Sequence, residues 1–336
     1  MTLLYPKDKT EWLKLRHDLV CSTEISALFG MNPYMTALEL AIAKKEPDPS
    51  TFEASERLEW GLVLQRAIAT QIARKYGVKV KALNGFGKSS ICRMGASFDY
   101  QIVGEDDTTV EDEGLRIMYR EHGPGVLEIK NVDGLIFKNQ WHETDGVLEA
   151  PPHIEIQIQA QLNCIGWKWG AFGVLIGGNR LELLIRKYDD AAGLAMNKKV
   201  IIFWNDLAAG KMPPVELPAD AGIIKQLYAY AEPEKVVDLQ ADADFAALCK
   251  EVADANLAIK IATEAKETAQ AKIILAMGDA EKALAAGYSV SAATVAEAQI
   301  EAKAYLRKAY RSLRVYPKKA AAPKKAKTPD TQELDL

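Results

Sequence analysis

The 336-residue sequence has few of the residues that usually build a disulfide framework or a soft metal site. It contains four cysteines, at positions 21, 92, 164 and 249, and no two of them form a Cys-x-x-Cys pair. Zinc and iron-sulfur sites need clustered thiolates, so the sequence favours neither, and the four cysteines are expected to be buried thiols. The four histidines likewise show no metal-ligand spacing, which favours surface or hydrogen-bonded histidines.

Long hydrophobic runs are missing too. No uninterrupted apolar stretch approaches the roughly 20 residues that a membrane-spanning helix needs, and residues 1–8 lack the charged and apolar blocks of a signal peptide. A cytoplasmic location is therefore expected. No Gly-x-Gly-x-x-Gly follows a first strand, so the sequence does not favour a doubly wound dinucleotide fold.

An excess of positive charge is absent as well. The chain has 42 Lys and Arg against 46 Asp and Glu, which gives a formal net charge of −4. This balance argues against a general electrostatic coating for nucleic acid, although it leaves room for a local groove of basic residues. Binding to DNA must therefore be argued from a site.

The order of the expected elements predicts an α/β fold in which helices flank a central mixed β-sheet. Helices are expected within residues 10–46, over 55–76 and over 153–165. Strand-like runs are expected over 78–81, 94–103, 115–119, 126–132, 169–176 and 180–188. At 49% apolar residues, the chain can bury a full core.

Composition divides the chain into three expected segments: a core domain over 1–232, a helical region over 233–316 and a disordered tail over 317–336. The helical region is rich in alanine, and we expect a hairpin of two helices over 242–277 and 294–313, broken at Gly278. The tail is rich in lysine and then acidic, which is typical of a solvated end.

The most informative motif is Glu128-Ile129-Lys130, inside the apolar run 125–132. Side chains at i and i+2 share a face of a strand, so Glu128 and Lys130 would point together. Asp99, expected at the end of a neighbouring strand, would add a second carboxylate. Such a cluster is suited to binding a hard divalent cation and positioning a water, which is nuclease chemistry.

Glu-x-Lys also occurs twice elsewhere, at Glu264-Ala265-Lys266 and Glu301-Ala302-Lys303. Both copies lie in alanine-rich stretches, where i and i+2 fall on different sides of a helix, so they would not converge on a metal. For the copy at Glu128, the alternative is an exposed strand edge that carries a same-face ion pair.

Four segments follow one another within about residues 10 to 190: 12–16 with 22–30, then Ser97-Phe98-Asp99, 127–130, and the glutamine-rich 157–162. In this order they resemble the motifs of the YqaJ-like, lambda exonuclease-like recombination nucleases of phages, which belong to the PD-(D/E)xK superfamily. The resemblance implies the restriction-endonuclease-like core of that superfamily.

The resemblance also implies roles at the cluster. Asp99 and Glu128 would coordinate Mg²⁺ or Mn²⁺, with the backbone carbonyl of Ile129 as a further ligand. Lys130 would orient or deprotonate the attacking water and offset negative charge in the transition state. Gln157 would lie beside the scissile phosphate or the water.

A second group of residues matches the positions that bind a 5′-terminal phosphate in that family. These are Arg16, Ser22 or Thr23, and Ser97. A guanidinium fork suits the task.

One position departs from the family pattern. The family has a helical Glu in Gly-x-x-x-Glu, and this chain has Gln65 after Gly61. A neutral amide binds Mg²⁺ more weakly than a carboxylate, so a second metal site would be altered, mediated by water or completed by Glu59.

The resemblance therefore predicts a Mg²⁺-dependent exonuclease that resects one strand of linear duplex DNA from a 5′ end and leaves a 3′ overhang. It also implies a ring-shaped homo-oligomer, a single-strand annealing protein as partner and, for a phage-encoded chain, the host-cell cytoplasm. Two alternatives stay open: an endonuclease with the same cluster, and a catalytically silent DNA-binding protein in which Gln65 disables metal binding.

Overall fold

The computed structural model describes residues 2–46, 56–105, 113–144, 147–297 and 313. The chain divides into two compact units, Met1–Ile223 and Ile224–Leu336. The expected segment boundaries at residues 232 and 316 stay predictions.

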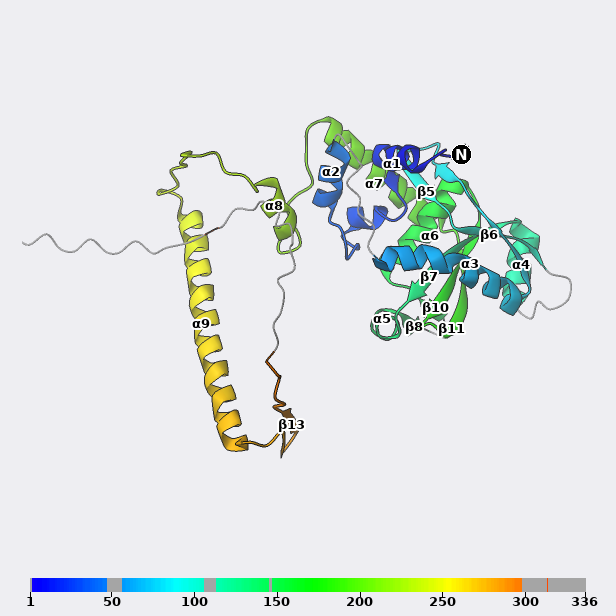
Figure 1. Cartoon of the computed structure of the whole chain (residues 1–336). Helices are drawn as coiled ribbons and strands as arrows, with labels where there is room; N and C mark the ends of the chain where they lie inside the picture. Colours follow the sequence, from blue (N-terminus) through cyan, green and yellow to red (C-terminus); the bar gives the residue numbers. More distant parts are fainter. Residues whose placement is uncertain (1, 47–55, 106–112, 145–146, 298–312, 314–336) are drawn as a thin grey trace, which may run out of the picture. The chain divides into compact units, whose positions relative to one another are not determined.

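A five-stranded mixed sheet forms the centre of the first unit (Figure 1). β7 and β10 run parallel, and the other neighbours are antiparallel. In spatial order the strands are β11 (Arg180–Lys187), β10 (Trp169–Ile176), β7 (Gly125–Val132), β6 (Tyr100–Glu105) and β3 (Val78–Ala82).

Helices cover both faces of this sheet. On one face, α3 (Glu56–Tyr76) and α4 (Glu113–His122) share a core with Leu127 and Ile129 of β7. On the other face, α6 (Pro152–Ile165) shares a core with Val126. Neighbouring residues of β7 enter different cores because side chains alternate along a strand. The expected α/β fold with a mixed sheet flanked by helices is therefore confirmed.

A smaller sheet also packs against α6, which contacts both sheets. In spatial order its strands are β1 (Thr2–Leu4), β4 (Phe86–Lys88), β5 (Met94–Ser97) and β2 (Val20–Cys21). The single strand expected over 94–103 is therefore wrong, because the chain leaves this sheet after Ser97 and enters the central sheet at Tyr100. Asp99 lies in the short link between the two sheets.

The strand expected over 115–119 is also wrong, since these residues belong to α4. Leu115, Met118 and Tyr119 have the spacing i, i+3, i+4 of one helical face, and all three pack on the core beneath α4. Over five residues, an alternating pattern and a helical pattern can both be read from the same apolar side chains.

The remaining elements of the first unit surround this framework. They are α1 (Lys9–Asp18), the 3₁₀ helix η1 (Ile25–Phe29), α2 (Ala37–Lys45), α5 (Gly134–Gln140), β8 (His142–Thr144), β9 (Val147–Glu149) and α7 (Asp190–Ala208). α8 (Ala221–Leu227) crosses the boundary between the two units.

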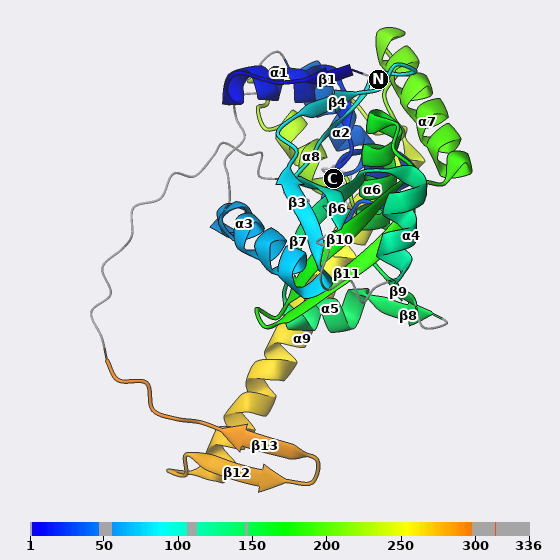
Figure 2. The ribbon, with the colours of Figure 1, turned by 90° about the vertical axis from the view of Figure 1, so that its right-hand side faces the viewer.

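The second unit contains one long helix, α9 (Ala243–Met277), which confirms the first helix expected in this region. α9 ends at Gly278, and a β-hairpin of β12 (Lys282–Ala285) and β13 (Tyr288–Ser291) follows it (Figure 2). The purely helical region expected here therefore needs correction, because two strands interrupt it. Gly287, at φ +78°, supplies the tight turn between them. The second expected helix and the tail lie almost wholly outside the described residues.

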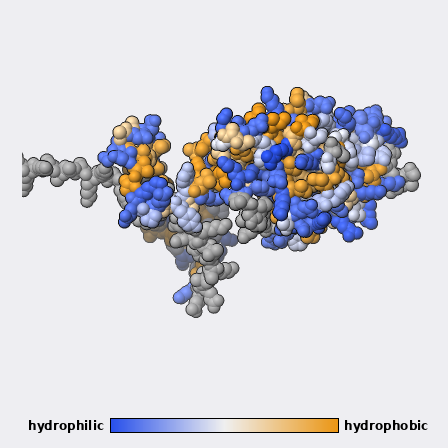
Figure 3. All heavy atoms as spheres, turned by 90° about the horizontal axis from the view of Figure 1, so that it is seen from above, coloured by the Kyte–Doolittle hydropathy of each residue, from blue (hydrophilic) through white to orange (hydrophobic). Residues whose placement is uncertain are grey.

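The described surface mixes polar and apolar side chains, and hydrophobic patches interrupt the hydrophilic face in Figure 3. Among the described helices, none has both the length and the hydrophobicity that crossing a membrane requires. All four cysteines are free thiols; Cys21 and Cys164 are buried as expected, while Cys92 and Cys249 are partly buried.

Candidate active site

The site lies on β7, just beyond the point where its pairing with β6 stops. β6 begins at Tyr100, which faces Leu127. Alternate residues of a strand direct both N–H and C=O toward the same neighbour, so Ile129 is the next residue to face that side. The Asp99 carboxylate takes the place of a strand there, because its Oδ2 accepts the Ile129 N–H at 3.0 Å. The Ile129 carbonyl points toward the same side.

The Glu128 side chain projects from the other face of β7 than the side chains of Leu127 and Ile129, and it points toward α6. Its side chain is buried, and three donors surround the carboxylate. Oε1 accepts from Gln157 Nε2 at 2.6 Å and from Lys130 Nζ at 2.8 Å, and Oε2 accepts from Gln161 Nε2 at 2.7 Å. A buried carboxylate needs such partners to offset its lost hydration.

Lys130 lies between Glu128 and α6. Besides its ion pair with Glu128, its Nζ donates to Gln157 Oε1 at 2.9 Å. Its side chain is 21% exposed, whereas that of Glu128 is 6% exposed, so the amine stands at the mouth of the cluster. The expected set Asp99, Glu128, Lys130 and Gln157 is thus brought together.

The Asp99 carboxylate has an unusual electrostatic environment. Burial, and next the charge of the nearby Glu128, raise its pKa to about 7, although the bond from Ile129, the Lys130 charge and the bond from Gln65 act in the opposite direction. The negative charges of Asp99 and Glu128 repel each other, and a cation bound between the two carboxylates would remove that repulsion.

The oxygen atoms of the cluster are suitable ligands for one hard divalent cation. Asp99 and Glu128 supply anionic oxygens, and the Ile129 carbonyl, which faces the same edge of β7 as Asp99, adds a neutral oxygen. No group of three or more His, Cys, Asp or Glu side chains gathers anywhere in the described residues. The set is therefore poorer in carboxylates than a site that holds two ions through acidic side chains.

Gln65 lies beside Asp99, as its place in the pattern Gly-x-x-x-Glu implied. Its Nε2 donates to Asp99 Oδ1 at 3.0 Å, so α3 offers a hydrogen-bond donor where a carboxylate would offer a ligand. Glu59, two turns earlier on α3, is exposed and is not among the described partners of Asp99. Of the two candidates for a further ligand, only Gln65 reaches the cluster.

The residues expected to bind a 5′-phosphate form a chain of contacts that leads from α1 to Ser97, two residues before Asp99. Trp12 Nε1 donates to Ser97 Oγ at 2.9 Å. The Arg16 guanidinium lies 4.9 Å from the centre of the Trp12 ring and donates to Thr23 Oγ1 at 3.4 Å. Its side chain is 24% exposed. Ser22 is buried, and this makes Thr23 the better candidate of the two hydroxyls.

Sequence reasoning missed the acidic partner of Arg16. Glu24 Oε1 accepts from Arg16 at 3.3 Å, and Glu24 Oε2 accepts from Lys44 Nζ at 2.7 Å and from the Cys21 N–H at 2.9 Å. Lys44 is nearly inaccessible, at 4% exposure. One carboxylate therefore balances two cations, and the group keeps one net positive charge.

Gln161 was missed as well, although it belongs to the glutamine-rich segment that the resemblance used. It follows Gln157 by four residues, so both lie on the face of α6 that meets β7. The spacing i, i+4 could have identified it. Gln159 lies on another side of α6, where it donates to the Lys187 carbonyl at 2.8 Å.

His153, in the first turn of α6, is a further neighbour of the cluster. Burial, and next the Lys130 charge, lower its pKa, which keeps the ring neutral near pH 7. Its ring packs edge-on against Tyr34, with 5.7 Å between ring centres. The sequence predicted only that the histidines lie at the surface or form hydrogen bonds, and it did not place His153 beside the cluster.

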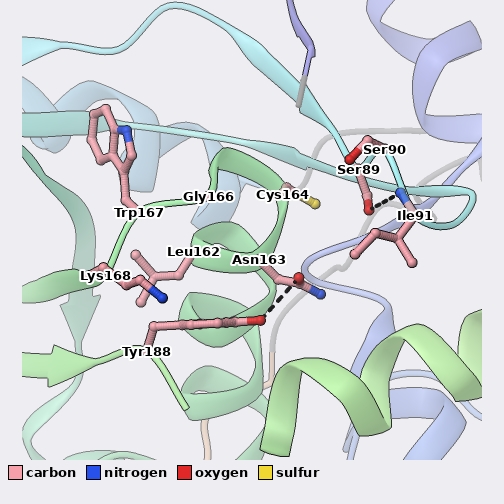
Figure 4. A pocket seen from close by; sticks show the side chains of 10 residues that line it. All are labelled: Ser89, Ser90, Ile91, Leu162, Asn163, Cys164, Gly166, Trp167, Lys168 and Tyr188. Carbon is pink, nitrogen blue, oxygen red and sulfur yellow. Dashed lines mark hydrogen bonds between the residues drawn. The ribbon is translucent and has the colours of Figure 1, made fainter. Parts of the chain in front are cut away.

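A separate cavity of about 290 Å³ lies at the end of α6, between the turn after β4 and the loop that leads into β10 (Figure 4). Polar groups in its wall pair with each other, since Tyr188 Oη donates to Asn163 Oδ1 at 3.1 Å and the Ile91 N–H donates to Ser89 Oγ at 3.1 Å. No carboxylate lines it, so this cavity cannot hold a cation in the way the cluster can.

Comparison with known proteins gives matches that cover the cluster. Residues 11–168 match the model of a family described as YqaJ-like viral recombinase domain. The "Uncharacterized protein YqaJ" of Bacillus subtilis (strain 168) is 27% identical over 243 residues, which are 69% of this chain and 67% of the relative.

Two solved structures are also similar to this chain. The alkaline exonuclease LHK-Exo from Laribacter hongkongensis is 18% identical, with a TM-score of 0.42, over 60% of this chain and 93% of its own. LHK-Exo in complex with dAMP has the same identity and TM-score over 65% of this chain and 97% of its own.

The matched segment 11–168 contains most of α1, the link at Asp99, β7 and α6, and so includes every residue of the cluster. The order of the four motifs already favoured this family, and the match confirms it. Residues 11–168 of this chain are therefore similar to the YqaJ-like viral recombinase domain.

Proposed function

We propose that this chain is a DNA nuclease of phage-type recombination that depends on Mg²⁺ or Mn²⁺ and hydrolyses linear duplex DNA from a 5′ end, leaving a 3′ overhang. One observation carries the proposal: Asp99, Glu128 and Lys130 lie together at the part of β7 where its pairing with β6 has ended, with Gln157 against the amine. This arrangement corresponds to the Asp and Glu-x-Lys constellation of PD-(D/E)xK nucleases.

Asp99, Glu128 and the Ile129 carbonyl would hold the cation. When bound, the ion would polarise a phosphoryl oxygen and lower the pKa of a bound water. Lys130 would hold the attacking water or a phosphate oxygen through its exposed amine, and its charge would offset the negative charge of the transition state. Gln157 would keep that amine in place, because its Oε1 accepts from Lys130 while its Nε2 donates to Glu128.

The 5′ polarity would come from the contacts around Arg16. Its guanidinium is partly exposed and has Thr23 Oγ1 beside it, and a terminal phosphate could accept from both. Trp12 connects this position to Ser97, two residues before Asp99. A phosphate held there would place the terminal nucleotide near the cluster. We also propose a ring-shaped homo-oligomer and a single-strand annealing partner, on the family resemblance alone.

The test is digestion of linear duplex labelled at one 5′ or one 3′ end, with Mg²⁺, with Mn²⁺ or with EDTA. We expect metal-dependent release of nucleotides from 5′ ends. Lys130→Ala should reduce the rate about a hundredfold or more while duplex binding is retained. Lys138→Ala, which removes an exposed lysine on α5, is the matched control and should digest normally. Digestion in EDTA, or full activity of Lys130→Ala, would overturn the proposal.

One further substrate and one variant separate the alternatives. Cleavage of covalently closed circular duplex would indicate an endonuclease, because an exonuclease needs an end. Binding without hydrolysis under every metal condition would indicate a silent DNA-binding protein. The bond from Gln65 to Asp99 favours testing this second case directly, by restoring a carboxylate at position 65.

A further inference from the structure

Within the second unit, α9 is a 35-residue helix that has no buried residue among the described residues. A helix of this length is about 52 Å long. Several large apolar side chains on it are exposed, among them Phe245 at 45%, Leu248 at 57% and Ile259 at 63%. An isolated helix gains little stability from its own hydrogen bonds, so a long helix with exposed apolar side chains needs a partner.

Five large apolar side chains of α9 lie on one stripe of the helix, which we call the α9 seam, whereas Leu257, Ile261, Ile274 and Leu275 are exposed outside it. Successive seam positions are alternately three and four residues apart, and this is the heptad spacing of a coiled coil. Large residues and alanines share these positions, with one lysine among them. The seam consists of Phe245, Leu248, Val252, Ala255, Ile259, Ala262, Lys266, Ala269, Ile273 and Ala276.

The seam is complementary to a reversed copy of itself. If two α9 helices run antiparallel with Ile259 opposite Ala262, every other seam position also meets a seam position. Most layers then set a large side chain against a small one, which is how facing helix surfaces interdigitate. The layers are Phe245 with Ala276, Leu248 with Ile273, Val252 with Ala269, Ala255 with Lys266, and Ile259 with Ala262.

The charges beside the seam fit the same register. Glu251 and Lys272 each immediately precede a seam residue, so they border the seam on the same side. In the antiparallel pair, Glu251 of each helix faces Lys272 of the other, which gives two ion pairs between oppositely charged residues. Between them, Ala258 faces Ala265, and these small side chains let the helices approach closely.

Two α9 helices that run parallel and in register lack this complementarity. It would set Lys266 against Lys266 inside the seam, and like charges there are unfavourable. It would also set alanine against alanine in four layers, leaving space that no side chain fills. The antiparallel arrangement also has twofold symmetry, the commonest symmetry of homodimers.

We propose that α9 pairs antiparallel with α9 of a second copy of this chain, through the α9 seam. The pairing is separate from the proposed nuclease activity and can fail without affecting it. The occupant is a second copy because the layers and both ion pairs are complementary to this same helix.

The first test compares the mass of the full-length protein with that of two variants, by sedimentation equilibrium over a range of concentrations. Ile259→Asp puts a carboxylate into the centre of the seam and should halve the mass of the particle. Leu257→Asp is the matched control, because Leu257 is similarly exposed at 57% but lies outside the seam. It should leave the mass unchanged. Circular dichroism checks that both variants keep their helix content.

The second test exchanges the charges. Glu251→Lys or Lys272→Glu alone turns both attractive pairs into repulsive ones and should weaken association about tenfold. The double variant restores opposite charges and should recover the original dissociation constant. Glu264→Lys, which makes the same charge change away from the seam, should have no comparable effect.

Three results would overturn the proposal. The first is a mass that Ile259→Asp does not change, as expected if another part of the same chain covers the seam. The second is an equal loss of mass in Leu257→Asp. The third is a double charge variant that associates no better than either single variant.

Discussion

Gln161 ties Glu128 to the strand that precedes Asp99. Its Nε2 donates to Glu128 Oε2 at 2.7 Å and to the Ser97 carbonyl at 3.0 Å. Ser97 ends β5 of the smaller sheet, and Glu128 lies in the central sheet. One buried amide therefore fixes the two carboxylates of the cluster relative to each other, although it has no exposed surface with which to touch a substrate.

Gln161→Leu should raise the Mg²⁺ concentration needed for half-maximal activity by about tenfold, because losing a positioning contact to a metal ligand typically weakens metal binding by that order. The two lost hydrogen bonds also destabilise the fold, by about 1–3 kcal/mol for each buried acceptor left without its partner. Gln159→Leu is the control, since Gln159 bonds to the Lys187 carbonyl and the Asp189 N–H instead. If Gln161→Leu lowers Tm but leaves the Mg²⁺ dependence unchanged, the residue has only a structural role.

Gln65→Glu should make the protein more dependent on its cation. The new carboxylate would replace an amide that donates to Asp99 and would add a like charge beside Asp99 and Glu128. We expect a lower Tm than the original protein without metal, and a larger rise in Tm when Mg²⁺ or Mn²⁺ is added. Differential scanning fluorimetry with and without EDTA measures both effects.

Gln65→Leu separates the effect on Tm of losing the amide from the effect of the added charge, because it removes the amide without adding a charge. It should lower Tm without enlarging the shift that Mg²⁺ produces. A similar Mg²⁺ shift in Gln65→Glu and the original protein would mean that position 65 does not reach the ion, and the departure from the family pattern would then have no consequence for metal binding.

The raised pKa of Asp99 predicts how the stability of the metal-free protein depends on pH. The folded protein holds this proton up to about pH 7, whereas an unfolded aspartate loses it near 3.8. The folded state therefore binds more protons in this window, and the stability that this carboxyl contributes is lost as the pH rises from about 4 to about 7. Asp99→Asn should flatten this part of the pH profile of Tm in EDTA.

Metal binding should show the opposite trend, since a cation competes with the proton on Asp99. The apparent affinity for Mn²⁺, followed by calorimetry, should increase as the pH rises through about 7. An affinity that stays constant between pH 6 and pH 8 would mean that Asp99 is not a ligand. Asp99→Asn should bind Mn²⁺ weakly at every pH.

The sequence was informative where a feature depends on local spacing. Glu128 and Lys130 share a face because they are two residues apart in a strand, and that spacing needs no knowledge of the fold. The position of Asp99 was harder to predict, because nothing in the apolar run 94–103 shows that the chain changes sheets there. Its contact with Ile129 depends on where β6 begins, which only strand pairing decides.

Contacts between distant segments were the least predictable. Glu24 balances Arg16 and Lys44, which lies 20 residues further along the chain, and no short motif contains all three. The segment around Leu115 was misread because five residues are too few to separate a period of 2 from a period of 3.6. The β-hairpin after α9 was missed because alanine-rich composition favours helix on either side of it.

Arg16→Ala should reduce the preference for 5′-phosphorylated ends. The Arg16 guanidinium packs on Trp12 and reaches Thr23, so it can turn from Glu24 toward a terminal phosphate without losing its support. We expect the ratio of digestion rates on phosphorylated and hydroxyl ends to fall about tenfold, as for the loss of one hydrogen bond between charged groups. The measurement uses duplexes that differ only in this phosphate.

Arg93→Ala is a matched control for Arg16→Ala. The Arg93 guanidinium also packs on a tryptophan, at 3.6 Å from the Trp204 ring, but it donates to the Asp18 carbonyl and contacts neither Thr23 nor Glu24. Its loss should lower stability without changing end preference. If the unmodified protein digests both kinds of end equally, Arg16 has no phosphate to recognise. Its ion pair with Glu24 would then serve only to hold α1 against the 3₁₀ segment that follows.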